Sequence, residues 1–202
     1  MTRNRRLTSS EGRTHLATLQ PKRYLAIVNV LPDYLRPGLD LVIVGINPGV
    51  RSAAAGRHYA GPGNHFWPLL RESGLVTETL VPADDARVLE WSIGLTNMVD
   101  RASPSITDLS LEELRAGAVA LRGKLVKFAP RLVCFNGKRI YEVFAGHPIA
   151  FGLQPETIGP SRVYVMPSTS ARAAAYQRAD KLRFFLELRQ LVRETRAEAV
   201  AS

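Results

Sequence analysis

The chain has 202 residues, 46% apolar and 22% charged, a composition typical of one globular domain with a buried core. Lys and Arg outnumber Asp and Glu by 27 to 18, and the resulting net charge of +9 favours a polyanionic partner, either a nucleic acid or anionic lipid headgroups. A single cysteine, Cys134, excludes an internal disulfide and an all-cysteine metal or iron–sulfur site, and the four scattered histidines do not suggest zinc; we expect no metal. No apolar run approaches the roughly 20 residues of a membrane helix, and the start lacks the apolar core of a secretory signal, so no membrane partner is expected.

Residues 1–20 hold four arginines against one glutamate and few large apolar side chains. Such a segment buries too little surface to offset its ordering entropy, so we expect a disordered basic arm. A transit peptide has a similar composition, but a solvated arm is the interpretation we favour. The rest of the chain predicts one domain over residues 21–196 and a tail over 197–202, in a reducing compartment: the cytoplasm or nucleoid, or the nucleus of a eukaryote.

Short apolar runs, rich in β-branched residues, alternate with stretches of helical periodicity. The runs predict buried parallel strands at 41–45, 92–99, 132–135 and 163–166. Helices are expected from a capping box at Ser110 and Glu113 onward, over about 136–145, and over about 173–195. Their apolar positions are Leu111, Leu114, Ala118, Leu121 and Leu125 in the first; Ile140, Val143 and Phe144 in the second; Leu182, Phe185, Leu186 and Leu191 in the third. The alternation predicts an α/β fold, a single-domain three-layer α/β/α sandwich with a mostly parallel central sheet, whose ligands bind beyond the carboxyl ends of the strands.

The first loop at such a strand end is Gly45-Ile-Asn-Pro-Gly49. Two glycines and a proline specify a tight, rigid turn, and Asn47 is its one polar side chain. Asn47 either braces the turn, as asparagine often does, or presents its amide to a ligand. A phosphate-binding loop is disfavoured because the segment holds no lysine.

The second loop, residues 56–67, is rich in glycine and carries the aromatic Tyr59, which suits a flat ligand stacked on its ring. Asn64 is expected to cap the helix that follows, and Phe66 and Trp67 to lie in the core. His65 is more typical of a structural histidine than of a catalyst.

The third loop, Pro167-Ser-Thr-Ser-Ala-Arg172, ends in an arginine that either is solvated or acts as a wedge filling the space left by an extruded base.

These loops, taken with 96–101 and 135–138, occur in one order that resembles the mismatch-specific uracil/thymine DNA glycosylases, the thymine-DNA glycosylase branch most closely. The segments that carry the likeness are Gly45-Ile-Asn-Pro-Gly49, Gly-Pro-Gly-Asn-His-Phe-Trp at 61–67, Thr96-Asn-Met-Val-Asp-Arg101, Phe135-Asn-Gly-Lys138 and Met166-Pro-Ser-Thr-Ser-Ala-Arg172. The match runs from about Leu31 to Leu191, so five short motifs in register cover most of the chain.

The resemblance implies a monomeric enzyme with the uracil-DNA glycosylase fold and no cofactor. Its partner would be double-stranded DNA with a mismatched or damaged pyrimidine. The enzyme would flip this base, which lies opposite guanine, out of the duplex and excise it. On this likeness Asn47 positions the attacking water. The base pocket would hold Ile46, His58, Tyr59, Asn97 and Ser168, with Tyr59 stacking on the base and Asn97 reading its edge. The DNA-contacting wedge would be Ser170, Ala171 and Arg172.

Asp100 stands where the vertebrate thymine enzyme has a glutamate, so it is a second catalytic candidate. Its carboxylate would polarise the water or stabilise the sugar cation; the alternative is a structural pair with Arg101 or a loop cap.

Past the wedge the sequence departs from the thymine branch: Ala175, Tyr176 and Gln177 replace its Gln, aromatic and Pro. Strict dependence on an opposite guanine is therefore in question, and uracil opposite adenine or in single strands is an open alternative. Two other functions stay open: a non-catalytic DNA-damage-binding relative, and a nucleotide-binding enzyme, which the lack of a phosphate loop disfavours.

Overall fold

The computed structural model describes residues 31–201, so the predicted basic arm lies outside the described residues. Its centre is a five-stranded sheet of order β2-β1-β3-β5-β4, with β1 at Leu41–Gly45, β2 at Ile93–Asn97, β3 at Leu132–Asn136, β4 at Gly152–Ile158 and β5 at Ser161–Met166. The four predicted strands are confirmed and run parallel to one another, while β4 is antiparallel to β5 at the edge.

Strand β4 was not predicted. Most of its residues are exposed or half-buried, it contains Pro155, and its pairing with β5 shifts between Leu153 and Thr157. A proline and an irregular register are tolerated at a sheet edge, where one side of the strand needs no partner. The same features remove the alternating apolar pattern by which a strand is recognised in a sequence.

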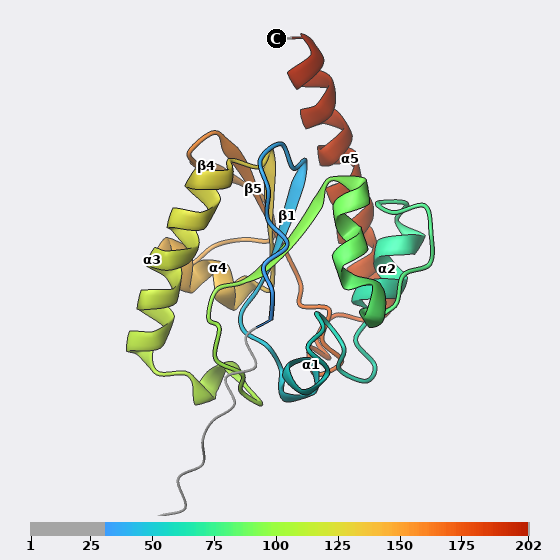
Figure 1. The fold of residues 1–202 in the computed structure, drawn as a ribbon. Coiled ribbons are helices and arrows are strands. Elements are labelled where there is room, and N and C mark those ends of the chain that lie inside the picture. The colour runs from blue at the N-terminus through green and yellow to red at the C-terminus, as the bar shows by residue number, and fades with distance from the viewer. Residues whose placement is uncertain (1–30, 202) are drawn as a thin grey trace, which may run out of the picture.

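Helices cover both faces of the sheet, as the three-layer prediction requires (Figure 1). Successive strand residues point to opposite faces, so Leu41 and Ile43 enter one core while Val42 and Val44 enter the other. The first core packs against α2 (Phe66–Glu72) and α5 (Arg178–Ala201), the second against α3 (Leu111–Phe128) and α4 (Lys138–Ala145). Shorter helical turns, α1 (Val50–Ala55), η1 (Pro82–Trp91) and η2 (Ile106–Asp108), lie in the connections.

Helix α3 begins as predicted. Ser110 Oγ accepts from the Glu113 backbone N–H at 3.1 Å, and Glu113 Oε2 accepts from the Ser110 N–H at 2.8 Å, which is the expected capping box. Leu114, Leu121 and Leu125 are buried, but Leu111 is 58% exposed and does not belong to the apolar stripe. Leu111 is the first residue of the helix, next to the Ser110 cap.

The last helix was predicted five residues too early. The alanines at 173–175 favour a helix by propensity, yet α5 begins at Arg178, where Asp180 Oδ2 accepts a hydrogen bond from the Gln177 N–H at 3.0 Å. Just before it, Tyr176 packs edge-on against Phe151 and Phe184, and this contact holds the chain in a non-helical path.

Helix α5 also continues through Ala201, into the residues that the sequence assigns to a tail. Phe185 is buried as predicted, but Leu186 is 44% exposed because Leu188 and Val192 supply the core contacts instead. None of the helices within residues 31–201 is long and apolar enough to cross a membrane.

Candidate active site

A cleft of about 510 Å³ lies where the parallel strands end. The register places Gly45 beside Asn97 and Asn136 beside Met166, so the loops that follow all four strands open onto one edge of the sheet. Every predicted site residue except Asp100 lines this cleft: Ile46, Asn47, His58, Tyr59, Asn97, Ser168, Ser170, Ala171 and Arg172. Ser103 and Asn136 line it too, although the sequence did not single them out as site residues.

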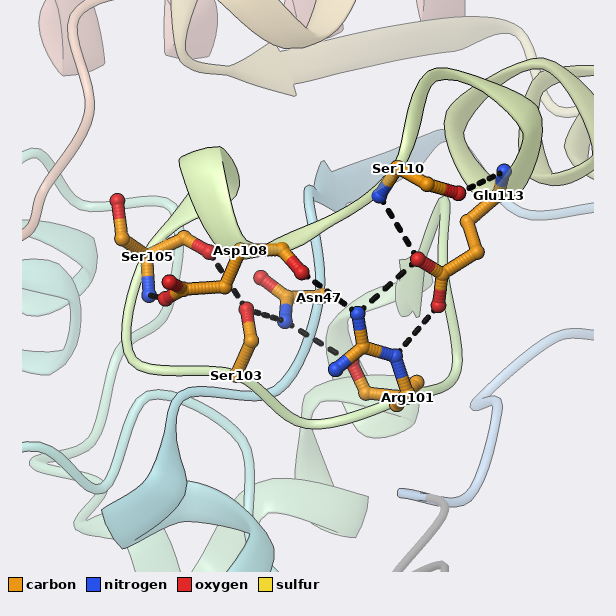
Figure 2. A network of polar contacts seen from close by, with 7 residues as sticks. All are labelled: Asn47, Arg101, Ser103, Ser105, Asp108, Ser110 and Glu113. Carbon is orange, nitrogen blue, oxygen red and sulfur yellow. Dashed lines mark hydrogen bonds and ion pairs between the residues drawn. The ribbon is translucent and has the colours of Figure 1, made fainter.

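Asn47 is held by both hydrogens of its side-chain amide (Figure 2). Its Nδ2 donates to the Arg101 carbonyl at 2.9 Å and to Ser103 Oγ at 2.8 Å. Ser103 Oγ in turn donates to the Ser105 carbonyl at 2.6 Å. Because both donors are used, the amide has one orientation, and Oδ1 is left as the atom that can accept a hydrogen bond from a molecule in the cleft.

The loop that holds Asn47 is itself tied to the start of α3. The Arg101 guanidinium binds both oxygens of the Glu113 carboxylate, at 2.5 and 3.0 Å, and donates to the Asp108 carbonyl at 2.8 Å (Figure 2). The hydrogen bond from Arg101, followed by that from the Ser110 backbone, lowers the pKa of Glu113 to about 2. The capping carboxylate of α3 therefore also orients the segment whose carbonyl contacts Asn47.

Asp100 lies apart from the other candidates. It is exposed and does not line the cleft, although it precedes Arg101 directly. Within residues 31–201, Asp100 forms no ion pair with Arg101, which binds Glu113 instead, and its carboxylate accepts no capping hydrogen bond, so neither structural alternative is observed. A catalytic role for Asp100 stays a prediction, one that this arrangement of side chains does not favour.

Asn97 lies against the backbone of the neighbouring strand end. A Cβ atom added to Gly45 would collide with Asn97 Oδ1 and would come within 3.6 Å of the Tyr59 hydroxyl. Glycine at this position therefore lets Asn97 and Tyr59 approach the first loop. Asn97 is 9% exposed, and its amide makes no side-chain hydrogen bond within the described part of the chain, so its donor and acceptor are available to a ligand.

Tyr59 presents an aromatic ring whose position is fixed. The ring stacks on Phe66 with centroids 3.8 Å apart and planes 16° from parallel. Its backbone has φ of +54°, an uncommon conformation for a residue other than glycine. Burial raises the pKa of the hydroxyl well above its usual value, so the group is a neutral donor and acceptor at physiological pH.

His58 lines the cleft but is built into the fold. It is 2% exposed, and its Nε2 lies 2.9 Å from the Pro32 carbonyl, which requires a hydrogen on that nitrogen. Burial lowers the pKa of His58, so the ring is neutral at pH 7.

Asp85, on η1, fixes the loop that carries His58 and Tyr59. Its fully buried carboxylate accepts from the Tyr34 hydroxyl at 2.9 Å, Arg57 Nη1 at 2.8 Å and the His58 N–H at 2.9 Å. No local sequence signal marks an acid in a short helical turn as the partner of three distant groups.

Asn136 fixes the third loop. Its Nδ2 donates to Thr169 Oγ1 at 3.0 Å, and its Oδ1 accepts from the Thr169 N–H at 2.9 Å. The loop continues into a turn in which the Ala173 N–H donates to the Ser170 carbonyl at 3.1 Å. Ala171 and Arg172 occupy the two central positions of that turn, and both are exposed. We call residues 167–177 the wedge segment, because they contain the three residues to which the family resemblance assigns a wedge.

The cleft thus offers amides, hydroxyls and one aromatic ring around a neutral interior, with arginines at its rim. A second hollow of about 520 Å³ shares Tyr59, Gly61 and Asn64 with the cleft, but its walls are mainly apolar. No three His, Cys, Asp or Glu side chains within residues 31–201 gather as metal ligands would. Such a site suits recognition of a flat polar ring.

Comparisons with known proteins bear on the family and on the fold. Residues 32–193 match the model of the uracil DNA glycosylase superfamily. The fold is similar to a solution NMR structure from Methanosarcina acetivorans, of a protein provisionally assigned as a uracil DNA glycosylase. The TM-score is 0.53 and the identity 19%, over 80% of this chain and 96% of the other. The family match supports DNA glycosylase activity, the hydrolysis of an N-glycosyl bond in DNA. By this match over most of its length, the chain belongs to the uracil DNA glycosylase superfamily.

Proposed function

We propose that this protein is a monofunctional glycosylase that excises uracil mispaired with guanine and leaves an abasic site for base excision repair. Thymine and other modified pyrimidines in the same mispair are the further substrates we would test. The proposal rests mainly on Asn47, whose amide is held by Arg101 and Ser103 so that only Oδ1 remains to orient a water.

The reaction requires the base to leave the duplex first, because its glycosidic bond is inaccessible within the stack. Extrusion costs a few kcal/mol and least for a mismatched base, which favours a G·U pair over a correct pair. Ala171 and Arg172, which are exposed at the tip of the wedge segment, would fill the space that the base leaves.

In the cleft, the Tyr59 ring supports the face of the pyrimidine and Asn97 binds its edge. An asparagine amide both donates and accepts, which matches the adjacent carbonyl and imide groups of uracil. Hydrogen bonds of this kind favour departure of the base as an anion.

Hydrolysis then breaks the bond between C1′ of the sugar and N1 of the base and joins C1′ to the water oxygen. The base departs with the bonding electrons, and the sugar passes through an oxocarbenium-like state. Asn47 cannot take the proton of the water, so this proton passes to solvent or to the departing base. Turnover is therefore expected to be slower than with a carboxylate base.

The test is a single-turnover assay on G·U, G·T, A·U and G·ethenocytosine duplexes and on single-stranded uracil. We expect fastest excision from G·U, and Asn47→Ala should slow it by about 10²-fold or more. Gln190→Ala, a change of an exposed amide on α5, is the matched control and should retain the wild-type rate.

Specific binding to the mismatch without excision would instead support the non-catalytic relative. Equal rates on G·U and A·U would contradict the mismatch preference and leave a general uracil glycosylase.

A further inference from the structure

Lys181, in the first turns of α5, breaks the apolar pattern of its helix. The buried face of α5 carries Lys181, Phe185, Leu188, Val192 and Thr195 at helical spacing. Lys181 is 2% exposed and ranks among the largest fully buried side chains. A lysine thus occupies a position where the spacing would place an apolar residue.

The ammonium of Lys181 has little to compensate for its burial. Its one hydrogen bond is donated by Nζ to the Ser170 carbonyl at 3.1 Å, and no carboxylate within residues 31–201 forms an ion pair with it. Asp180, its neighbour in sequence, binds Arg183 and the Gln177 backbone instead. Burial without a countercharge lowers the pKa of Lys181. Such groups are destabilising in folded proteins, and an unbranched apolar side chain would suit the position better.

The carbonyl that Lys181 binds belongs to the turn at the tip of the wedge segment. The same Ser170 oxygen accepts the hydrogen bond of the Ala173 N–H that closes this turn. Upstream, Thr169 is already fixed by Asn136 and by the hydrogen bond from the His65 N–H to its carbonyl, at 3.0 Å. Lys181 adds an anchor at the residue directly before Ala171 and Arg172.

We propose that Lys181 is a positioning residue that locks the turn carrying Ala171 and Arg172, so that the wedge meets the duplex already shaped. The inference rests on the proposed function of the wedge segment. It explains a destabilising side chain by a gain in DNA binding: the turn would lose less conformational freedom when it enters the helix.

The test compares four proteins: wild type, Lys181→Met, Arg172→Ala and the double variant. Methionine is unbranched and close to lysine in volume, although one atom shorter, and it removes the charge. Each protein is assayed for thermal stability and for affinity toward a duplex with a tetrahydrofuran abasic analogue opposite guanine. A fully paired duplex of the same sequence is the reference.

We expect Lys181→Met to melt at or above the wild-type temperature and to lose several fold in preference for the abasic duplex, no more than Arg172→Ala loses. The double variant should lose no more than Arg172→Ala alone, because both changes act through the same turn. A lowered melting temperature with unchanged preference would show Lys181 to be structural, and additive losses would show that it acts apart from the wedge; either result overturns the proposal.

The binding assay separates this inference from the proposed activity. A wild-type protein that prefers the abasic duplex but excises no uracil would refute the glycosylase proposal while leaving Lys181 testable. A wild-type protein without such a preference would refute the wedge and the role of Lys181 with it.

Discussion

Asn47 and Arg172 follow strands β1 and β5 at the same edge of the sheet, yet the fold holds them in different ways. The groups that bind the Asn47 amide are themselves held by further contacts, which extend to the ion pair of Arg101 with Glu113. Arg172 is exposed at the tip of a turn that a buried ammonium anchors from behind. The fold fixes the side chain that would meet the reacting atoms by many mutually satisfied contacts. It leaves Arg172, the side chain that would meet the duplex, exposed. The turn that carries Arg172 is held by Lys181, a buried group that destabilises the fold.

The largest effect, on thermal stability, is expected from removing the buried Asp85 carboxylate, which holds the loop that carries His58 and Tyr59. Asp85→Ala removes the acceptor of three hydrogen bonds and leaves the buried His58 N–H unpaired, so we expect unfolding to become easier by about 3 kcal/mol. For a domain of this size the midpoint of thermal unfolding should fall by about 6 to 12 °C. Glu78→Ala, which removes an exposed ion pair with Arg87, should hardly move it. A shift no larger than that control would show that the 56–64 loop does not depend on Asp85.

The next effect concerns the support of Asn47. Arg101→Met removes the side-chain hydrogen bonds to Glu113 and to the Asp108 carbonyl. The backbone carbonyl of residue 101, which binds Asn47, is then held less firmly. Misplacement of a reacting group by about 1 Å can cost 10²-fold, so we expect excision from G·U to slow by about 10- to 100-fold under single turnover. Arg115→Met changes an exposed arginine on α3, the helix that carries Glu113; it is the control and should leave the rate unchanged.

The pH dependence of that effect follows from Glu113. Its pKa is lowered to about 2, so the pair is complete above the ordinary carboxyl value near 4.5 and weakens only as the pH falls toward 2. The factor by which Arg101→Met slows excision should therefore be constant between pH 5 and 9. A factor that changes within this range would mean that another titrating group controls Asn47.

A smaller effect, on DNA affinity, is expected from replacing Arg172. The salt dependence of that affinity distinguishes a wedge from an arginine that only faces solvent. Arg172→Ala should weaken binding to a G·U duplex by several fold while the slope of log affinity against log salt stays the same, because a wedge contacts bases rather than phosphates. Arg51→Ala, at the exposed rim of the cleft, should reduce that slope by about 0.9, the value for one phosphate contact. A slope change of that size at Arg172 would identify it as a phosphate ligand.

Much of this architecture follows from local sequence patterns. The β-branched runs at 41–45 and 132–135 and the capping box of Ser110 are local signals, and the structure has them where they were predicted. The rule that ligands bind beyond parallel strand ends predicted a shared site for Asn47 and for the loop that carries Tyr59, and both line the cleft. Asn97 was named only by the family resemblance, and it lines the same cleft.

The supporting residues could not be found in this way. Asp85, Ser103 and Lys181 act through contacts with segments distant along the chain, and nothing in their immediate neighbours marks them. A contact between distant segments also explains why α5 begins later than predicted. The packing of Tyr176 against Phe151 overrides the helix propensity of the alanines before it.

The smallest effect is expected at Asp100. Its carboxylate either takes part in the reaction or lies outside the active site, and the two interpretations predict different rates for Asp100→Asn. A carboxylate that is exposed and outside the cleft cannot polarise a water held by Asn47 unless its loop rearranges. The hydrogen bonds that fix this loop, from the Val99 N–H to the Ile46 carbonyl at 2.8 Å and from the Ser103 N–H to the Pro48 carbonyl at 3.1 Å, oppose such a movement. We therefore expect Asp100→Asn to keep the single-turnover rate within about twofold between pH 5 and 9, well short of the 10²-fold or more typical of a general base. A tenfold loss at neutral pH that fades in acid would instead place its carboxylate at the reacting sugar and require the loop to move when DNA binds.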